Sequence, residues 1–227
     1  GDFKADNLLV EGTRLRVLDL DRETVGDPAL DLGKFCADLR WWALAAGTRI
    51  KYVHFWRHTA LSDGRIGAGC LSQWWPSPFT VDGVEYATAE HWMMAAKARL
   101  FGDPEGERRA LAAGHPAEAQ KAGRLVRGFD EAIWRRERFG IVVEGNVHKF
   151  ASDADLRGFL LNTGERSETG VPPARGWGRV LVEASPLDRV WGIGLAADDE
   201  GATDPARWRG PNLLGFALME ARERLRT

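Results

Sequence analysis

The chain has 227 residues, of which 44% are hydrophobic and 28% charged, and this suits one large globular domain or two small ones. Its formal net charge of −2 excludes a global positive field that would hold it on nucleic acid or a membrane surface, so a nucleic-acid substrate would need a local basic patch. The sequence has no apolar run of transmembrane length, and its two cysteines, Cys36 and Cys70, form neither a metal-binding nor a disulfide pattern. We therefore expect a cytoplasmic protein without a metal ion or other cofactor, which does not bind membranes.

Residues 1–46 have the residue order of a phosphotransferase catalytic loop. Asp2 follows a glycine, Asn7 comes next, and Asp19 follows a short predicted strand. This order resembles the aminoglycoside phosphotransferase-like kinases, and the resemblance implies that Asp2 is the catalytic aspartate and that Asn7 and Asp19 bind magnesium. Phosphoryl transfer also needs a glycine-rich phosphate loop and a lysine-bearing strand, and the sequence shows neither before this segment. We therefore expect residues 1–46 to be a truncated, non-functional fragment.

A second domain is predicted over residues 52–227, after a short junction at 47–51. The junction follows a run of small residues, and the sequence then becomes aromatic. A hairpin is expected at 80–86, because Asp82-Gly83 is a dipeptide typical of tight two-residue turns.

Most of this domain reads as helix. Proline opens two of the predicted helices at a first-turn position, and the apolar pattern over 129–150 fits one long helix or two consecutive ones. The sum is a helix-rich α+β domain that lacks the strand–helix alternation of a doubly wound sheet. Its other expected elements are a strand at 51–56, helices at 86–101, 104–113, 116–126 and 153–161, a long loop at 165–178, strands at 180–183 and 190–195, and a final helix at 211–226.

The predicted helix at 86–101 places an acid and a base on one face. Thr88 is a candidate N-cap and Gly102 a candidate terminator. Glu90 and Lys97 return to the same face about two turns apart. Because helical side chains lean toward the N-terminus, we expect the Lys97 stem to run back toward Glu90, so that both reach one ligand. The alternative is an amphipathic helix on which both charges are solvated.

The order of motifs over about residues 52–226 resembles the NADAR, or YbiA-like, family. Two departures stand out: Gln73-Trp74-Trp75 replaces an asparagine followed by Phe-Tyr, and the loop at 165–178 is longer than usual. The shared motifs are Leu71-Ser72, Pro76 to Phe79, Asp82-Gly83, Tyr86, Glu90-His91, Lys97-Ala98, Lys149-Phe150, Leu160-Leu161, Thr163-Gly164, Leu181 to Pro186, Asp188, Trp191 to Leu195, Pro205, Trp208 and Asn212 to Gly215.

The resemblance implies an N-glycosidase that cleaves a ribosyl C1–N bond. Family members act on ADP-ribose attached to guanine in nucleic acid, or on ribosylamino-pyrimidine phosphates of riboflavin synthesis. Such a reaction builds an oxocarbenium-like centre that needs a nearby carboxylate, and Glu90 is the candidate. Lys97 has two open roles: it holds a phosphate or ribose oxygen as a point charge, or it attacks C1 and forms a Schiff base. The expected partner is a ribosyl- or ADP-ribosyl-nucleobase, in one case within DNA.

Further residues of these motifs are candidates for substrate binding, and each has a structural alternative. Tryptophans stack on a base or pack in the core, and glycines admit a phosphate or give a strand room. Ser72 and Asn212 contact the ribose or diphosphate, or cap local turns. One of Glu183 and Asp188 serves as a second carboxylate, or both support the turn between them. His91 is expected to pack against the helix rather than to bind a metal. The candidates are Ser72, Trp75, Trp92, Glu183, Asp188, Trp191, Gly192, Gly194 and Asn212.

Two other classes of function are weighed against the enzyme. One is a module that binds ADP-ribose or a nucleotide without cleaving it, but such a reader has no need of both Glu90 and Lys97. The other is a small-molecule kinase, which depends on residues 1–46 alone.

Overall fold

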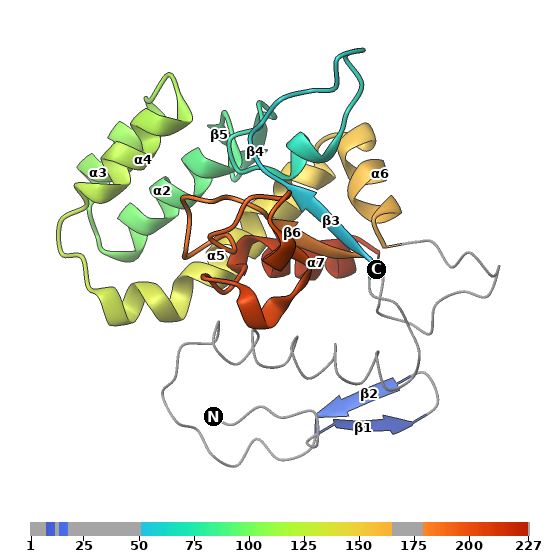
Figure 1. The fold of residues 1–227 in the computed structure, drawn as a ribbon. Helices are drawn as coiled ribbons and strands as arrows, with labels where there is room; N and C mark the ends of the chain where they lie inside the picture. The colour runs from blue at the N-terminus through green and yellow to red at the C-terminus, as the bar shows by residue number, and fades with distance from the viewer. Residues whose placement is uncertain (1–7, 12–13, 18–50, 165–178, 227) are drawn as a thin grey trace. The chain divides into compact units, whose positions relative to one another are not determined.

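The computed structural model describes residues 8–11, 14–17, 51–164 and 179–226 (Figure 1). Most of the predicted phosphotransferase fragment, with Asp2, Asn7 and Asp19, lies outside these residues, as do the greater part of the junction and the loop at 165–178. Within the fragment, the antiparallel pair β1 (Leu8–Glu11) and β2 (Arg14–Val17) is described, with Leu8 opposite Val17. None of the described helices is both long and apolar enough to span a membrane.

The molecule divides into two compact units. The strand unit comprises residues 1–55 and 162–216 and contains β1, β2, β3 (Tyr52–Phe55), β6 (Val180–Glu183) and the 3₁₀ helices η3 (Glu200–Thr203) and η4 (Pro205–Arg207). The helical unit comprises residues 56–161 and 217–227 and contains η2 (Ala68–Leu71), β4 (Phe79–Val81), β5 (Val84–Tyr86), α2 (Ala89–Leu100), α3 (Pro104–Leu111), α4 (Pro116–Arg124) and α5 (Glu131–Ala151). Helices α6 (Ala154–Asn162) and α7 (Leu213–Arg224) each cross a boundary between the units.

In the helical unit, α2 packs against α3, α4 and α5 (Figure 1). The segment that fitted one helix or two forms the single helix α5, whose N-terminus is capped by the Asp130 carboxylate accepting from the Ile133 N–H at 2.9 Å. Pro104 and Pro116 open α3 and α4 as predicted. The predicted hairpin is also confirmed, because Asp82 and Gly83 have φ of 49° and 79°, as a type I′ turn requires.

Helix α2 is buried along most of its length instead of presenting one solvated face. Every residue from Ala89 to Ala95 is buried, and so is Ala98. Thr88 occupies the N-cap position, but its hydroxyl is hydrogen-bonded to the His91 ring at 2.8 Å rather than to a backbone N–H. Gly102, with φ of 64°, ends the helix as predicted, because the left-handed region favours glycine.

The close approach of α2 to α5 depends on a glycine. A Cβ atom at Gly145 would lie 2.3 Å from Cδ1 of Trp92, whereas at Gly140, on the same helix, nothing lies within 4 Å of it in the described chain. We therefore predict that Gly145→Ala lowers the free energy of unfolding by about 1–3 kcal/mol through overpacking. The matched variant Gly140→Ala should raise it by about 0.5–1 kcal/mol, because alanine favours helix. Urea unfolding of both variants checks this, and equal effects would contradict the packing described.

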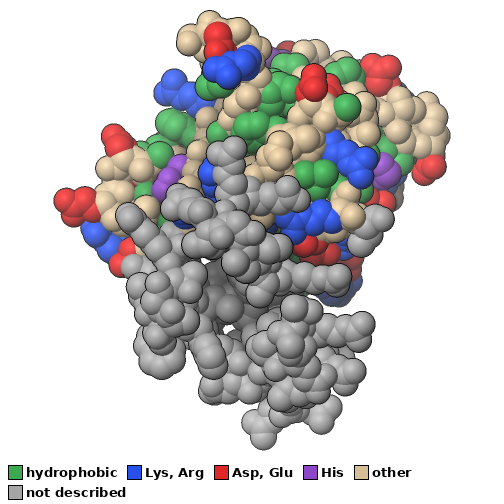
Figure 2. Space-filling view, turned by 90° about the vertical axis from the view of Figure 1, so that its right-hand side faces the viewer, with side chains coloured by type: hydrophobic (Ala, Val, Ile, Leu, Met, Phe, Trp, Pro, Cys, Tyr) green, Lys and Arg blue, Asp and Glu red, His purple; other side chains and the backbone are tan. Residues whose placement is uncertain are grey.

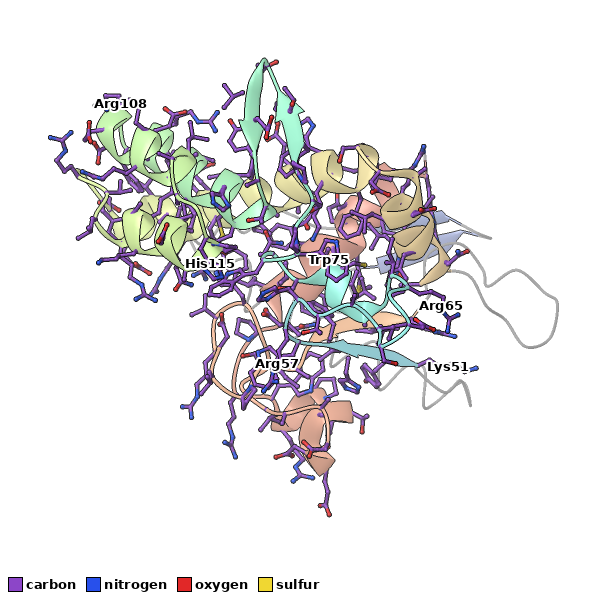
Figure 3. All side chains as sticks on the ribbon, turned by 90° about the horizontal axis from the view of Figure 1, so that it is seen from above. Lys51, Arg57, Arg65, Trp75, Arg108 and His115 are labelled. Carbon is purple, nitrogen blue, oxygen red and sulfur yellow. The ribbon has the colours of Figure 1, made fainter. Side chains whose placement is uncertain are left out.

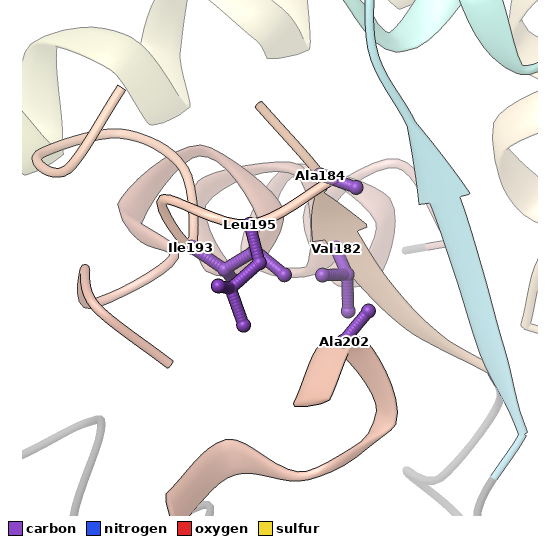
Figure 4. Packing of buried hydrophobic residues seen from close by; sticks show 5 residues of the cluster. All are labelled: Val182, Ala184, Ile193, Leu195 and Ala202. Carbon is purple, nitrogen blue, oxygen red and sulfur yellow. The ribbon is translucent and has the colours of Figure 1, made fainter. Parts of the chain in front are cut away.

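The strand unit contains a parallel strand pair in addition to the antiparallel pair β1–β2. β3 pairs with β6 in the register Tyr52 to Val180 and Phe55 to Glu183. Beside β6, the side chains of Val182, Ala184, Ile193, Leu195 and Ala202 form a buried apolar cluster (Figure 4). Burial of these side chains anchors the segments that follow β6 in the chain.

The predicted strand at 190–195 is wrong. The Asp188 carboxylate accepts from the N–H groups of Val190 and Trp191 at 2.8 and 2.7 Å, which forms a turn. Gly194 has φ of 66°, which is incompatible with an extended strand. Ile193 belongs to the buried cluster, so the apolar residue at this position reflects burial of a loop residue and not a strand.

Candidate active site

Glu90 lies in the first turn of α2 with only 3% of its surface exposed. Its backbone N–H donates to the carbonyl of Gln73 at 3.0 Å, so the segment after η2 is attached to the start of α2. The partial positive charge of a helix N-terminus stabilises a carboxylate in the first turn. Glu90 is therefore a fixed acidic group at a defined end of the helix.

Lys97 is half-buried near the other end of α2. Its Nζ lies 4.2 Å from the ring centroid of Phe129 and 5.3 Å from that of Trp134. Burial lowers the pKa of the Lys97 ammonium, and the nearby charge of Glu131 partly opposes this shift. A lowered pKa increases the fraction of neutral, nucleophilic amine.

The ring contacts of Lys97 place its ammonium along α5, and its convergence with Glu90 stays a prediction. Trp92, near the start of α2, donates from Nε1 to the carbonyl of Ile141 at 2.8 Å, whereas Lys97 faces Trp134, an earlier residue of α5. The two helices thus run antiparallel, and the ammonium lies toward the first turns of α5.

The segment from Ser72 to Trp75 is held by local hydrogen bonds beside Glu90. The Ser72 hydroxyl accepts from the Trp74 N–H at 3.2 Å, and the Ser72 carbonyl accepts from the Trp75 N–H at 3.2 Å. Gln73 is buried and donates from Nε2 to Oδ1 of Asn146 on α5 at 3.2 Å. Trp75 is half-buried (Figure 3). These contacts of Ser72 are explained by its support of the local turn. The Ser72 hydroxyl accepts in its bond to Trp74, so its O–H can still donate.

Lys149 on α5, which the sequence analysis gave only as part of a shared motif, has a structural role in this segment. Its side chain is fully buried, and its Nζ donates to the carbonyls of Cys70 at 2.6 Å and Ser72 at 2.7 Å. Burial lowers the pKa of the Lys149 ammonium to about 7 and raises the pKa of the Cys70 thiol to about 12. A signal was present in the sequence: Lys149 lies on the same helical face as the apolar Val142, seven residues earlier.

The burial of Lys149 gives stability a defined pH dependence. Its folded pKa lies below the ordinary value of about 10.4, so the unfolded state binds more protons between pH 7 and 10 and stability from this group rises with pH. We predict that Lys149→Met lowers the free energy of unfolding by about 1–3 kcal/mol at pH 9, because two buried carbonyls lose their donor, and by less at pH 7. Urea unfolding of both proteins at the two pH values checks this. A difference that does not change with pH would contradict it.

Trp92 and His91 are packed inside the helical unit. Trp92 is 6% exposed, and its ring centroid lies 5.0 Å from that of Tyr86 and 5.5 Å from that of His148. For His91, Nε2 donates to the carbonyl of Ala113 at 3.0 Å, which leaves Nδ1 to accept from Thr88, and burial lowers the pKa of the ring. The packing role expected for His91 is confirmed, and core packing accounts for the contacts of Trp92.

In the strand unit, Asn212 braces the end of β6. Its side chain is fully buried; Oδ1 accepts from the Glu183 N–H at 3.0 Å, and Nδ2 donates to the Leu181 carbonyl at 2.9 Å. The Trp191 carbonyl accepts from the Leu214 N–H at 3.0 Å. A Cβ atom at Gly192 would lie 2.8 Å from the Glu183 carbonyl oxygen.

These contacts place the strand-unit candidates together around the end of β6, as those of the helical unit are placed around α2. Each of the contacts described for Asp188, Gly192, Gly194 and Asn212 supports local structure, so the structural alternative accounts for them. Direct contact of these residues with a substrate stays a prediction.

Arginines at the surface of the helical unit are paired with acidic side chains. Arg108, which points outward on α3 (Figure 3), pairs with Glu105, and Arg135 pairs with Glu131 at 2.8 Å. On the face drawn in Figure 2, basic side chains lie among acidic and apolar ones. Within the described ranges, no group of three or more His, Cys, Asp or Glu residues is arranged to hold a metal ion.

Comparison with protein families gives two matches along the chain. A model described as the NADAR domain matches residues 54–226, and one described as the phosphotransferase enzyme family matches residues 1–61. Both resemblances drawn from the sequence motifs are thereby confirmed. The NADAR match spans residues of both compact units.

Three named proteins illustrate the similarity. N-glycosidase R617 of Acanthamoeba polyphaga mimivirus is 39% identical over 178 residues, covering 76% of this chain and 95% of that protein. Protein irg-1 of Caenorhabditis elegans is 30% identical over 177 residues, covering 70% of this chain and 77% of that protein. N-glycosidase YbiA of Escherichia coli is 29% identical over 148 residues, covering 65% of this chain and 76% of that protein.

The fold has a counterpart among solved structures. The NMR structure of the Escherichia coli protein YbiA matches with a TM-score of 0.58 at 24% identity, over 79% of this chain and 87% of that chain. This likeness concerns the fold alone. The predicted helix-rich α+β class is confirmed.

Proposed function

The chain belongs to the NADAR family, and we propose on that basis that it is an N-glycosidase that hydrolyses a ribosyl C1–N bond. The observation that carries the proposal is the fixed, buried Glu90 at the start of α2, with the half-buried Lys97 farther along the same helix. Similar proteins named N-glycosidase, R617 and YbiA, support the reaction class.

The substrate is a ribose or ADP-ribose attached to a nucleobase nitrogen. We propose two specific forms: ADP-ribose on guanine in nucleic acid, and a ribosylamino-pyrimidine phosphate of riboflavin synthesis. The net charge of −2 favours the small molecule or a short single strand, because a long duplex is usually bound by a basic field.

Glu90 acts on the developing positive charge at C1. As the C1–N bond lengthens, the ribose becomes oxocarbenium-like, and a carboxylate held beside it stabilises that charge. The same carboxylate receives protons from the attacking group and returns them to the departing base. Ser72 and Trp75, in the segment bonded to Glu90 through Gln73, are proposed to contact the substrate.

Lys97 acts as the nucleophile in this proposal. Its neutral amine attacks C1, the C1–N bond to the base breaks, and the electron pair of that bond leaves with the base nitrogen, which takes up the proton lost by the amine through Glu90. Opening of the sugar ring gives a Schiff base between C1 and Nζ. Water then hydrolyses it to free sugar and lysine. The lowered pKa of Lys97 supports this role over that of a point charge.

The domain assignment follows the same proposal. Residues 52–227 form the catalytic domain, residues 47–51 are a junction, and residues 1–46 are a phosphotransferase-like segment that has no kinase activity in this chain. Addition of ATP, magnesium and candidate acceptors tests the last point, and phosphoryl transfer above background would overturn it.

Release of free base by the purified protein tests the proposed function. ADP-ribosylated guanine in DNA and ribosylamino-pyrimidine phosphate are compared side by side, and cleavage of one alone identifies the substrate class. Cleavage of neither, together with tight binding of ADP-ribose, would make the protein a binding module.

A further inference from the structure

Trp74 lies between two histidines on the surface of the helical unit. Its ring centroid is 5.8 Å from that of His58, in a tilted arrangement, and 5.6 Å from that of His115, in an edge-to-face arrangement. Trp74 is half-buried, whereas both histidines are exposed. We refer to these three residues as the Trp74 cluster. It presents an aromatic face with polar groups at its borders.

Two separate connections place the Trp74 cluster near the start of α2. Trp74 directly follows Gln73, whose carbonyl accepts from the Glu90 N–H at 3.0 Å. On the other side, His115 lies two residues from Ala113, whose carbonyl accepts from Nε2 of His91, the residue after Glu90. The cluster is therefore connected to the first turn of α2, which carries Glu90.

The tautomer of the neutral His115 ring is set by a hydrogen bond to its helix. Its Nδ1 accepts from the Ala117 N–H at 3.1 Å and caps α4, so in the neutral ring the proton is on Nε2. This leaves an N–H donor at the border of the Trp74 ring. An indole face offers stacking to any nucleobase, and such a donor suits a ring nitrogen or carbonyl oxygen of that base.

We propose that the Trp74 cluster binds the nucleobase of the substrate, by stacking on Trp74 and by a hydrogen bond from His115. This inference rests on the proposed function. In that function the carboxylate acts at C1, and the base is bonded to C1, so the base must bind near the carboxylate. Trp74 is part of the departure from the usual family motif, so this chain carries an indole where a smaller ring is common.

The test compares KM and kcat for base release in three variants. Trp74→Leu removes the aromatic face and should raise KM by about 5- to 150-fold, the range for loss of one stacked base. Trp74→Phe keeps a ring and should stay within about tenfold of the unaltered protein. Trp56→Leu is the control: Trp56 is 41% exposed in the same unit and carries Arg57 on its ring instead of a histidine pair. An unchanged KM in Trp74→Leu, or an equal effect in Trp56→Leu, would overturn the proposal.

Binding without turnover separates this proposal from the proposed function. Guanosine 5′-monophosphate and uridine 5′-monophosphate are titrated by calorimetry into the unaltered protein and into Trp74→Leu and His115→Ala. Binding that weakens in both variants supports the Trp74 cluster even if no substrate is cleaved. Failure of both nucleotides to bind the unaltered protein, or equal binding in all three proteins, would overturn it.

Discussion

Glu90→Gln is expected to lower kcat for base release by about 100- to 10,000-fold, the usual contribution of a positioned acid–base group. Glutamine has nearly the same volume as glutamate, so the packing of this buried position is kept while the charge is lost. The backbone bond from residue 90 to the Gln73 carbonyl does not depend on the side chain. The variant should therefore fold and bind substrate, and its defect should appear in kcat.

Initial rates of base release, with circular dichroism to confirm folding, measure this effect. Glu85→Gln is the matched control, because Glu85 is an exposed acid on β5, close in sequence to Glu90. It should retain kcat within about twofold, since surface substitutions rarely have large effects. Full activity of Glu90→Gln would remove Glu90 from the mechanism.

Lys97→Arg is expected to be as inactive as Lys97→Ala, with kcat lowered by at least about 100-fold, since neither variant offers a neutral amine. Arginine stays charged at all working pH values, whereas burial lowers the pKa of Lys97. The arginine variant keeps the positive charge and can keep the contact with the rings of Phe129 and Trp134. It therefore separates a nucleophile from a point charge.

The pH profile of kcat adds a second measure of the same role. Activity of the unaltered protein should rise with pH through the lowered pKa of Lys97 and then level off. Lys121→Arg, at an exposed position on α4, is the control and should leave kcat unchanged. Activity of Lys97→Arg within tenfold of the unaltered protein would instead assign Lys97 an electrostatic role.

Local signals predicted much of the helical unit. Proline at a first turn, Asp82-Gly83 at a hairpin and Gly102 at a helix end each act through their own backbone preferences, so a short stretch of sequence suffices to place them. The degree to which α2 is buried was not predictable in this way. Close packing at Gly145 lets a second helix cover positions that the periodicity leaves open.

The strand predicted at 190–195 was wrong because its local signal was ambiguous. An apolar run is ambiguous between a strand and a loop anchored by buried side chains, and the turn at Asp188 decides between them. The hydrogen bonds of Asn212 to β6 join residues about 30 positions apart in the chain, so periodicity carries no sign of them.

In the candidate site, too, some features follow from local sequence and others depend on tertiary contacts. Glu90 and Lys97 could be selected from spacing on one helix, but the direction of the Lys97 ammonium depends on rings contributed by residues 129 and 134. The burial of Lys149 was not predicted, because a lysine is usually solvated; its hydrogen bonds to the carbonyls of Cys70 and Ser72 explain it. Spacing in the sequence thus predicts which residues share a helix, and tertiary contacts determine how their side chains are held.

Borohydride trapping during turnover tests the central claim most directly, because the claim is that the sugar passes from the base nitrogen to Lys97. Sodium borohydride is added to the protein with its cleavable substrate, and the digested protein is analysed by mass spectrometry. The account predicts one reduced sugar adduct on the peptide that contains Lys97, absent in Lys97→Arg. An adduct on Lys149 or another lysine, or continued base release with no adduct on any peptide, would contradict it.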